Sequence, residues 1–247
     1  MNHAIPLVIA HRGASGEAPE NTIGAFRLGL EQGCGGFELD VHLSKDGEIV
    51  VIHDFTVDRT TDGQGAVKDM LLSELRELDA GKWFSDAFSG ERIPTLKEVF
   101  ELSPPELMIN VEMKGGIGSG LEEALAELLR QSNRLDTVIV SSFDYKGLAN
   151  LKRIESSVKI GLLYDLRMAY HWKLPAVAGC EVYSLHPGLR RLDAEDVKAA
   201  IEQGLSVFPW TVNEEEKLLQ AISYGVNGII TDYPGRLRTI LKSKSFK

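Results

Sequence analysis

Apolar stretches of strand length recur along the whole chain, and segments with helical character lie between most of them. Thr22 to Glu31 begins at a capping residue and stops before Gly33, and Leu121 to Arg130 places its leucines on one stripe. Strands that alternate with single helices predict parallel β-α units, and eight such units in about 250 residues favour an α/β fold, the TIM (β/α)8 barrel. The alternative is an open doubly wound sheet, but no Gly-x-Gly-x-x-Gly follows the first strand. The strand-length stretches cover residues 6–11, 37–43, 49–53, 107–113, 137–142, 158–164, 182–186, 205–212 and 228–231.

Residues 54–106 interrupt this rhythm. They contain a turn-rich stretch from Asp58 to Gly65, a short acidic helical segment from Ser73 to Asp79, and a second helical segment from Thr95 to Leu102. We interpret them as a small insertion between strand 2 and strand 3 of the barrel. Its aromatic residues, Trp83, Phe84 and Phe88, are expected to form a satellite core rather than a ligand site. Because no internal repeat or low-complexity linker divides the chain, a single domain is predicted over residues 1–247.

Composition narrows the classes of protein that the chain can represent. A formal net charge of -9, without a long basic patch, argues against a nucleic-acid partner. The two cysteines, Cys34 and Cys180, lie in apolar or glycine-rich surroundings that suit reduced thiols. No window approaches the roughly eighteen apolar residues of a spanning helix, and no Lys or Arg precedes the first apolar run. We therefore expect a cytoplasmic protein without stable membrane association; the sequence leaves its oligomeric state open.

The stretch from residue 37 to residue 54 carries charge where a buried strand should carry none. Glu38, Asp40 and His42 alternate with apolar residues, so a strand places all three on one face. After a tight turn, a second apolar run ends at His53-Asp54. Two carboxylates in this spacing can converge on one hard cation, and a neighbouring imidazole can move a proton. Taken alone, the pattern also fits an ordinary amphipathic strand with a solvated face.

Polar residues gather at the ends of the other predicted strands as well. In a barrel, the carboxyl ends of the strands surround one mouth, which is where active sites lie. No single signal is specific, since one His-Arg pair or one Glu-x-Lys is common on protein surfaces. Their shared position is what points to a site. The residues concerned are His11 and Arg12 after strand one, Glu38 and Asp40 in strand two, His53 in the return strand, Glu112 and Lys114 in strand three, and His186, Trp210 and Asp232 after later strands.

This set of residue types suits phosphoryl transfer. The three carboxylates Glu38, Asp40 and Glu112, with no cysteine nearby, favour one oxygen-loving divalent cation, Mg²⁺ or Ca²⁺, over zinc. Such a cation, together with Arg12 and Lys114, can neutralise a phosphate group and stabilise the charge that builds up on it in the transition state. Two imidazoles, His11 and His53, can divide the proton transfers: one accepts a proton from the attacking hydroxyl or water, and the other protonates the leaving alkoxide.

The ordered motifs resemble those of the glycerophosphodiester phosphodiesterases, and specifically the bacterial, cytosolic type. The resemblance runs from residue 9 to about residue 235. The motifs are His11-Arg12-Gly13, Pro19-Glu20-Asn21-Thr22, Glu38-Leu39-Asp40-Val41, His53-Asp54, Arg59-Thr60-Thr61-Asp62-Gly63, Pro94-Thr95-Leu96, Glu112-Met113-Lys114, Trp210-Thr211-Val212-Asn213 and Thr231-Asp232-Tyr233-Pro234.

The resemblance implies a barrel that hydrolyses a small-molecule glycerophosphodiester to glycerol 3-phosphate and an alcohol with a divalent cation. By the same resemblance, His11 and His53 are the catalytic acid-base pair, and Arg12 and Lys114 contact the phosphate. Trp210 faces the glycerol, and Glu38, Asp40 and Glu112 bind the metal. The roles of His186 and Asp232 stay open, because a structural hydrogen bond would place them equally well. His42 is left out of the set because a turn follows it directly.

Two other readings compete with this one. A lysophospholipase D-like hydrolase would act on lipid phosphodiesters and would need an exposed apolar rim, which the acidic insertion does not suggest. A non-catalytic barrel that binds a phosphodiester would be favoured by loss of a histidine or a carboxylate from the set, and none is lost. The sequence does not distinguish Mg²⁺ from Ca²⁺ or identify the alcohol. It also leaves open whether water attacks directly or a cyclic phosphate forms first.

Overall fold

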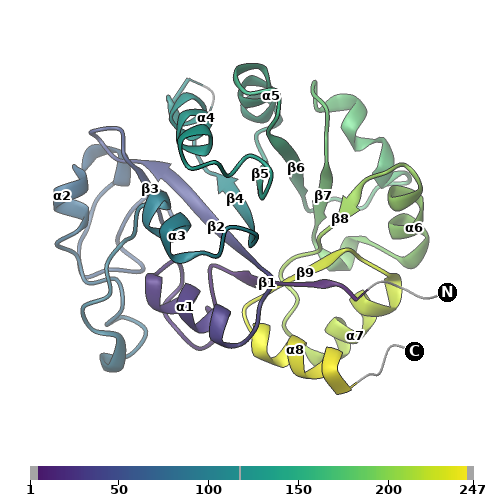
Figure 1. The fold of residues 1–247 in the computed structure, drawn as a ribbon, viewed down its shortest axis with the longest axis horizontal. Coiled ribbons are helices and arrows are strands. Elements are labelled where there is room, and N and C mark those ends of the chain that lie inside the picture. Colours follow the sequence, from purple (N-terminus) through teal and green to yellow (C-terminus); the bar gives the residue numbers. More distant parts are fainter. Residues whose placement is uncertain (1–4, 117, 244–247) are drawn as a thin grey trace.

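The computed structural model describes residues 5–116 and 118–243. Eight parallel strands follow one another in the order β8-β7-β6-β5-β4-β2-β1-β9, and β3 pairs antiparallel with β2. Helices surround the strands (Figure 1). The strands are β1 (Leu7–His11), β2 (Gly36–Leu43), β3 (Ile49–Val51), β4 (Met108–Met113), β5 (Val138–Ser142), β6 (Lys159–Tyr164), β7 (Ser184–Pro187), β8 (Ser206–Val207) and β9 (Gly228–Thr231).

Backbone hydrogen bonds join the two ends of this series. Asn227 N donates to Val207 O at 3.1 Å, and Ile230 N donates to Pro209 O at 3.1 Å. Val212 N in turn donates to Ile230 O at 2.9 Å. The predicted TIM barrel is therefore confirmed. The strand expected over residues 205–212 is shorter than predicted, because only Ser206–Val207 has regular strand pairing.

The helices occupy most of the predicted segments. They are α1 (Ile23–Glu31), α2 (Leu72–Leu75), α3 (Leu96–Leu102), α4 (Leu121–Gln131), α5 (Tyr145–Ile154), α6 (Ala194–Glu202), α7 (Glu215–Tyr224) and α8 (Pro234–Ser243). The short 3₁₀ helices are η1 (Val67–Asp69), η2 (Asp86–Phe88), η3 (His171–Val177) and η4 (Leu189–Arg191). Between β6 and β7 the connection contains η3, with Pro175 inside it, instead of an α-helix. Proline has no backbone N–H to donate, which is incompatible with a regular α-helix interior.

Side chains that alternate between the two faces of each strand form two separate apolar clusters, one outside and one inside the barrel. Val8 and Ala10 of β1 belong to the large core that packs under the helices, whereas Ile9 belongs to a small cluster with Ile139, Phe208 and Ile230. Because side chains of a strand alternate between its two faces, this second cluster fills the barrel interior. The next inward position of β1 is His11. Strand β2 follows the same rule: Phe37, Leu39 and Val41 pack outward in the large core, so Glu38, Asp40 and His42 point inward.

The insertion, residues 54–106, extends from the side of the barrel at β2 and β3 (Figure 1). A separate buried cluster beneath it is aliphatic and consists of Val50, Ile52, Val57, Val67, Leu75, Ala80 and Ile93. The aromatic residues expected there lie elsewhere: Trp83, Phe84 and Phe88 stack edge to face on one another, and Trp83 is exposed. The last helix of the insertion, α3, packs on the barrel, because Leu96, Val99 and Phe100 belong to the large core.

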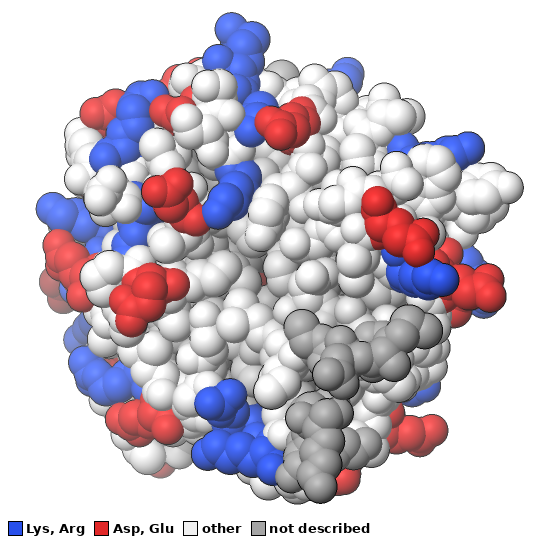
Figure 2. All heavy atoms as spheres, turned by 45° about the vertical axis from the view of Figure 1, so that its right-hand side comes forward, with Lys and Arg blue, Asp and Glu red and all other residues white. Residues whose placement is uncertain are grey.

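Two global features bear on possible partners. Among the described residues, no helix is both long enough and apolar enough to cross a membrane. On the face shown in Figure 2, lysine and arginine side chains lie among aspartate and glutamate side chains rather than in one continuous basic area.

Candidate active site

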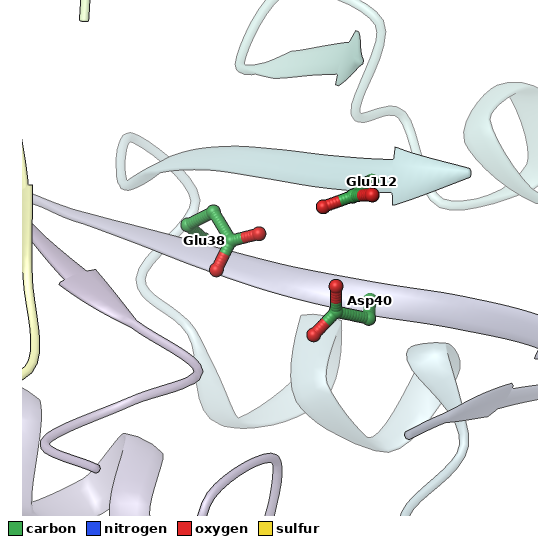
Figure 3. Close-up of side chains that lie close together, drawn as sticks. All are labelled: Glu38, Asp40 and Glu112. Carbon is green, nitrogen blue, oxygen red and sulfur yellow. The ribbon is translucent and has the colours of Figure 1, made fainter. Parts of the chain in front are cut away.

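Three carboxylates converge inside the mouth of the barrel. Glu38 and Asp40 come from β2 and Glu112 from β4, where Asp40 and Glu112 are partners in the parallel register. One oxygen from each lies within 4.8 Å of the others, and all three residues are buried. Figure 3 shows their carboxyl groups turned toward one another. The convergence follows from the pleat, since every second residue of adjacent strands faces the same side.

Burial and mutual repulsion make this cluster electrostatically costly. Burial, and then the neighbouring Asp40 and Glu112, raise the pKa of Glu38 well above its usual range. Burial and Asp40 raise the pKa of Glu112 to about 7. Burial acts on Asp40 in the same direction, but Lys114 and Arg12 outweigh it and hold the pKa of Asp40 below its usual range. Lys114 Nζ lies 3.1 Å from Asp40 Oδ1 and 2.6 Å from Glu112 Oε1.

A divalent cation fits this cluster. All its donors are carboxylate oxygens, which Mg²⁺ and Ca²⁺ prefer. The raised pKa values of Glu38 and Glu112 indicate that Lys114 and Arg12 do not fully compensate the buried negative charge. Additional positive charge at this point would therefore stabilise the ionised form of all three groups.

His11 ends β1 and is held by a carboxylate from the last strand. Its Nδ1 donates to Asp232 Oδ1 at 2.6 Å, and its Nε2 lies 3.7 Å from Glu38 Oε2. Asp232 is fixed in turn by Ser15 Oγ at 3.0 Å and by Asn213 Nδ2 at 2.6 Å. This arrangement directs Nε2 of His11 toward the acidic cluster.

His53 follows β3 and has a carboxylate partner of its own. Its Nδ1 donates to Asp54 Oδ1 at 2.6 Å. The backbone beside it is tied to β2, because Ile52 N donates to Asp40 O at 3.0 Å and His42 Nε2 donates to His53 O at 3.1 Å. Partial burial lowers the pKa of His53, although the Asp40 carboxylate opposes the shift. His42 therefore supports the backbone of His53 and does not enter the acidic cluster.

Arg12 approaches the cluster from the turn after β1. Its backbone has φ 56°, a left-handed conformation that is uncommon outside glycine, and its N–H donates to Glu38 O at 2.8 Å. The guanidinium donates through Nη1 to Glu20 Oε1 at 2.9 Å, and Nε lies 3.3 Å from Asp40 Oδ2. Asn21 supports the same carboxyl group by donating from Nδ2 to Asp40 Oδ2 at 2.9 Å.

One cavity of about 110 Å³ brings most of the sequence-predicted site residues together. Its polar side includes Glu38, Glu112 and the two imidazoles, and its apolar side is formed by Phe143, Leu163, Trp210 and Ile230. Trp210 is held by a hydrogen bond from Nε1 to His186 O at 2.6 Å. Of the eight predicted residues, His11, Arg12, Glu38, His53, Glu112, Lys114 and Trp210 line this cavity, and Asp40 lies next to it beneath Lys114 and Arg12.

The structure also separates the two residues whose roles the sequence left open. Asp232 contacts His11, whereas His186 is fully buried in the barrel interior, with Nε2 bonded to Ser184 Oγ at 2.8 Å. Burial lowers the pKa of His186 to about 3, so this imidazole stays neutral. Sequence reasoning assigned no role to Asp54, Glu20 or Asn21. Their only sequence signal was membership of the motifs that carry the family resemblance.

The chain matches the model of the Glycerophosphoryl diester phosphodiesterase family over residues 11–236. A glycerophosphodiester phosphodiesterase from Caldanaerobacter subterraneus subsp. tengcongensis is 46% identical over 239 residues, which cover 96% of this chain and 98% of the relative. One from Bacillus altitudinis is 35% identical over 235 residues, 93% of this chain and 95% of the relative. Among solved structures, a phosphodiesterase from Oleispira antarctica in complex with the product sn-glycerol-3-phosphate has a TM-score of 0.87 at 34% identity, with 96% of this chain and 97% of that chain covered.

Proposed function

The chain belongs to the glycerophosphoryl diester phosphodiesterase family, and we propose on this basis that it hydrolyses glycerophosphodiesters to sn-glycerol 3-phosphate and an alcohol, using one divalent cation and two histidines. One observation carries the proposal beyond family membership: two imidazoles, each fixed at Nδ1 by its own carboxylate, reach one cavity beside three converging acids. A non-catalytic binding barrel would not require this pair of oriented imidazoles.

Glu38, Asp40 and Glu112 are the residues that would hold the cation. When bound, the cation supplies positive charge that neutralises a phosphate and stabilises the charge that develops on it during the reaction. Lys114 contributes a compact positive charge between Asp40 and Glu112, and Arg12 a planar guanidinium beside them. Trp210 and Phe143 form an apolar wall that suits the carbon face of a glycerol unit.

The two imidazoles carry the proton transfers in this proposal. Because Asp232 and Asp54 accept from Nδ1 of His11 and His53, Nε2 of each ring is the atom that exchanges a proton with substrate. A neutral ring accepts a proton from the attacking hydroxyl or water, and a protonated ring donates one to the leaving alkoxide. Both rings have the geometry for either part, so the division between them is a matter for experiment.

The direct test is the release of sn-glycerol 3-phosphate by purified protein with Mg²⁺ or Ca²⁺. A panel of glycerophosphocholine, glycerophosphoethanolamine, glycerophosphoinositol and glycerophosphoglycerol should yield glycerol 3-phosphate and the free alcohol in equal amounts for at least one member. Comparing the two ions and the four substrates also identifies the preferred cation and alcohol. Folded protein that releases neither product from any of them would contradict the proposed function.

A lipid substrate is the second candidate, favoured by one observation. Phe143 lines the cavity yet is 54% exposed, and Leu166 and Tyr170, in the segment after β6, are exposed too. Apolar side chains around a mouth could accommodate an acyl chain on the glycerol. Lysophosphatidylcholine below its critical micelle concentration is the test substrate. Choline release faster than from glycerophosphocholine would favour this reading, and Phe143→Ser should then slow the lipid reaction selectively.

Substitution of Asp232 should impair His11 without disturbing substrate binding. In Asp232→Asn the amide can present its NH₂ to Nδ1 of His11 and so disfavour the reactive tautomer, and we expect kcat to fall about 100-fold with KM little changed. Steady-state kinetics with glycerophosphocholine measure both values. Asp144→Asn is a matched control, since Asp144 also follows a strand end but caps α5. A kcat for Asp232→Asn equal to that of the control would show that the carboxylate is not needed for catalysis.

A further inference from the structure

Arg59 of the insertion contacts two carboxylates at once, each through two hydrogen bonds. Its Nε and Nη2 donate to Asp54 Oδ2 and Oδ1 at 2.7 and 3.1 Å. Its Nη1 and Nη2 donate to Glu20 Oε2 and Oε1 at 2.8 Å each. Only a guanidinium has donors in a planar fork that can pair with two carboxylates in this way.

Each of these carboxylates holds one residue of the cavity. Asp54 accepts from His53 Nδ1, and Glu20 accepts from Arg12 Nη1. A continuous series of contacts therefore runs from Arg12 through Glu20, Arg59 and Asp54 to His53. Arg12 lies on the barrel after β1, whereas His53 is delivered by the return from β3. Arg59 thus links side chains that two different segments of the chain bring to the cavity.

The backbone that carries Arg59 is fixed by local hydrogen bonds. Thr61 Oγ1 donates to Val57 O at 2.8 Å and accepts from Gly63 N at 3.0 Å, while Gly65 N donates to Asp58 Oδ1 at 3.1 Å. The side chain therefore reaches toward the barrel from an anchored turn. Because it is 44% exposed, its ion pairs should add little to the stability of the fold. The four directional hydrogen bonds of Arg59 are therefore better explained by a role in fixing the orientation of its partners than by a contribution to stability.

We propose that Arg59 is a positioning residue for the reaction: through Asp54 it orients His53, and through Glu20 it orients Arg12. Both orientations thus depend on one guanidinium that does not line the cavity. The inference rests on the proposed function, because it needs His53 to act in turnover.

Two substitutions test the role directly. Arg59→Ala removes all four hydrogen bonds, and a displacement of about 1 Å in a catalytic group can lower the rate about 100-fold, which is the loss of kcat/KM that we expect. Arg59→Lys keeps a charge but not the fork, so it should recover only a small part of that loss. Arg76→Ala is the matched control. Arg76 makes the same two-bond pair with Glu98 at 2.9 Å at similar exposure, away from the cavity. It should retain activity close to that of the unmodified protein.

Double substitutions distinguish positioning from general damage to the fold. If Arg59 acts through Asp54 and Glu20, Arg59→Ala should cost much less in an Asp54→Asn or a Glu20→Gln background than it does alone. Arg76→Ala should have the same small effect in every background. Melting temperatures by circular dichroism should fall only slightly for Arg59→Ala and for Arg76→Ala, because both side chains are substantially exposed.

Either of two results would overturn the inference: activity of Arg59→Ala equal to that of Arg76→Ala, or losses that multiply fully in both double variants. These results are distinct from failure of the proposed function. If the proposed function fails, either the unmodified protein releases no product or His53→Ala is as active as the unmodified protein. An inactive His53→Ala beside a fully active Arg59→Ala rejects only the role of Arg59.

Discussion

Asp40→Asn is expected to lose the reaction almost completely, by about three orders of magnitude or more in kcat/KM, because the site would no longer hold the cation that we propose binds there. Asp40 is fully buried, sits between Lys114 and Arg12, and keeps its pKa below the usual range, so it is ionised throughout the working pH range. Of the three carboxyl groups, only Asp40 has a lowered pKa, whereas those of Glu38 and Glu112 are raised. Asp40→Asn therefore removes the carboxylate that is charged even without a cation. Turnover and calorimetric binding of Mg²⁺ or Ca²⁺ measure the two effects.

Chelation provides the matching experiment on the unmodified chain. EDTA should stop turnover, and one of the two ions should restore it; in Asp40→Asn neither should. Glu122→Gln is the control variant, because Glu122 is a buried carboxylate on α4 that is not part of the acidic cluster. Full activity after exhaustive chelation would contradict a metal-dependent reaction, while the fold and the family would be unaffected.

The cation affinity should also depend on pH in a defined direction. In the absence of a cation, burial and Asp40 raise the pKa of Glu112 to about 7, so this carboxyl group binds a proton at mildly acidic pH. A cation must displace that proton. Affinity should therefore weaken as the pH falls below about 7 and level off above it, where Glu112 is ionised. Calorimetry in two buffers of different ionisation enthalpy would detect the proton released on binding.

His11→Ala and His53→Ala should each lower kcat by about 100- to 10,000-fold on glycerophosphocholine, the usual contribution of a general acid or base. Each removes an imidazole that lines the cavity and whose Nδ1 is held by a carboxylate. Product affinity should change far less, because Arg12, Lys114 and the acidic cluster remain. Binding of sn-glycerol 3-phosphate by calorimetry separates the two effects.

The same variants can identify which histidine is the acid. A p-nitrophenyl ester of glycerol phosphate has a leaving group that departs without protonation, so the variant that lacks the acid should regain most of its activity on this substrate. The variant that lacks the base should stay slow on both substrates. His171→Gln, which alters a buried imidazole near Tyr164 outside the cavity, controls for effects on folding. If both variants hydrolyse glycerophosphocholine at the unmodified rate, acid-base catalysis by this pair is wrong.

The order of apolar and polar residues determined the fold and much of the site's composition. Strand alternation is a local property with a period of two, so Phe37, Leu39 and Val41 on one face require Glu38 and Asp40 on the other. The repeated strand-helix pattern then predicts parallel neighbours, whose inward residues meet at the barrel mouth. The structure confirms the barrel and brings seven of the eight predicted residues to one cavity, with Asp40 beside it. Their chemical roles are the proposals that the variants above test.

Tertiary structure alone decided how these groups are held. His11 and Asp232 meet because closure of the barrel brings β9 beside β1, a contact across 221 positions in sequence. Glu20 and Arg59 meet only when the insertion packs on the barrel. The aliphatic core of the insertion was likewise not predicted. Alternation and spacing indicate which side chains a strand places on each of its two faces. Which distant side chain contacts them depends on how the helices and strands are placed relative to one another, and no local pattern encodes that placement.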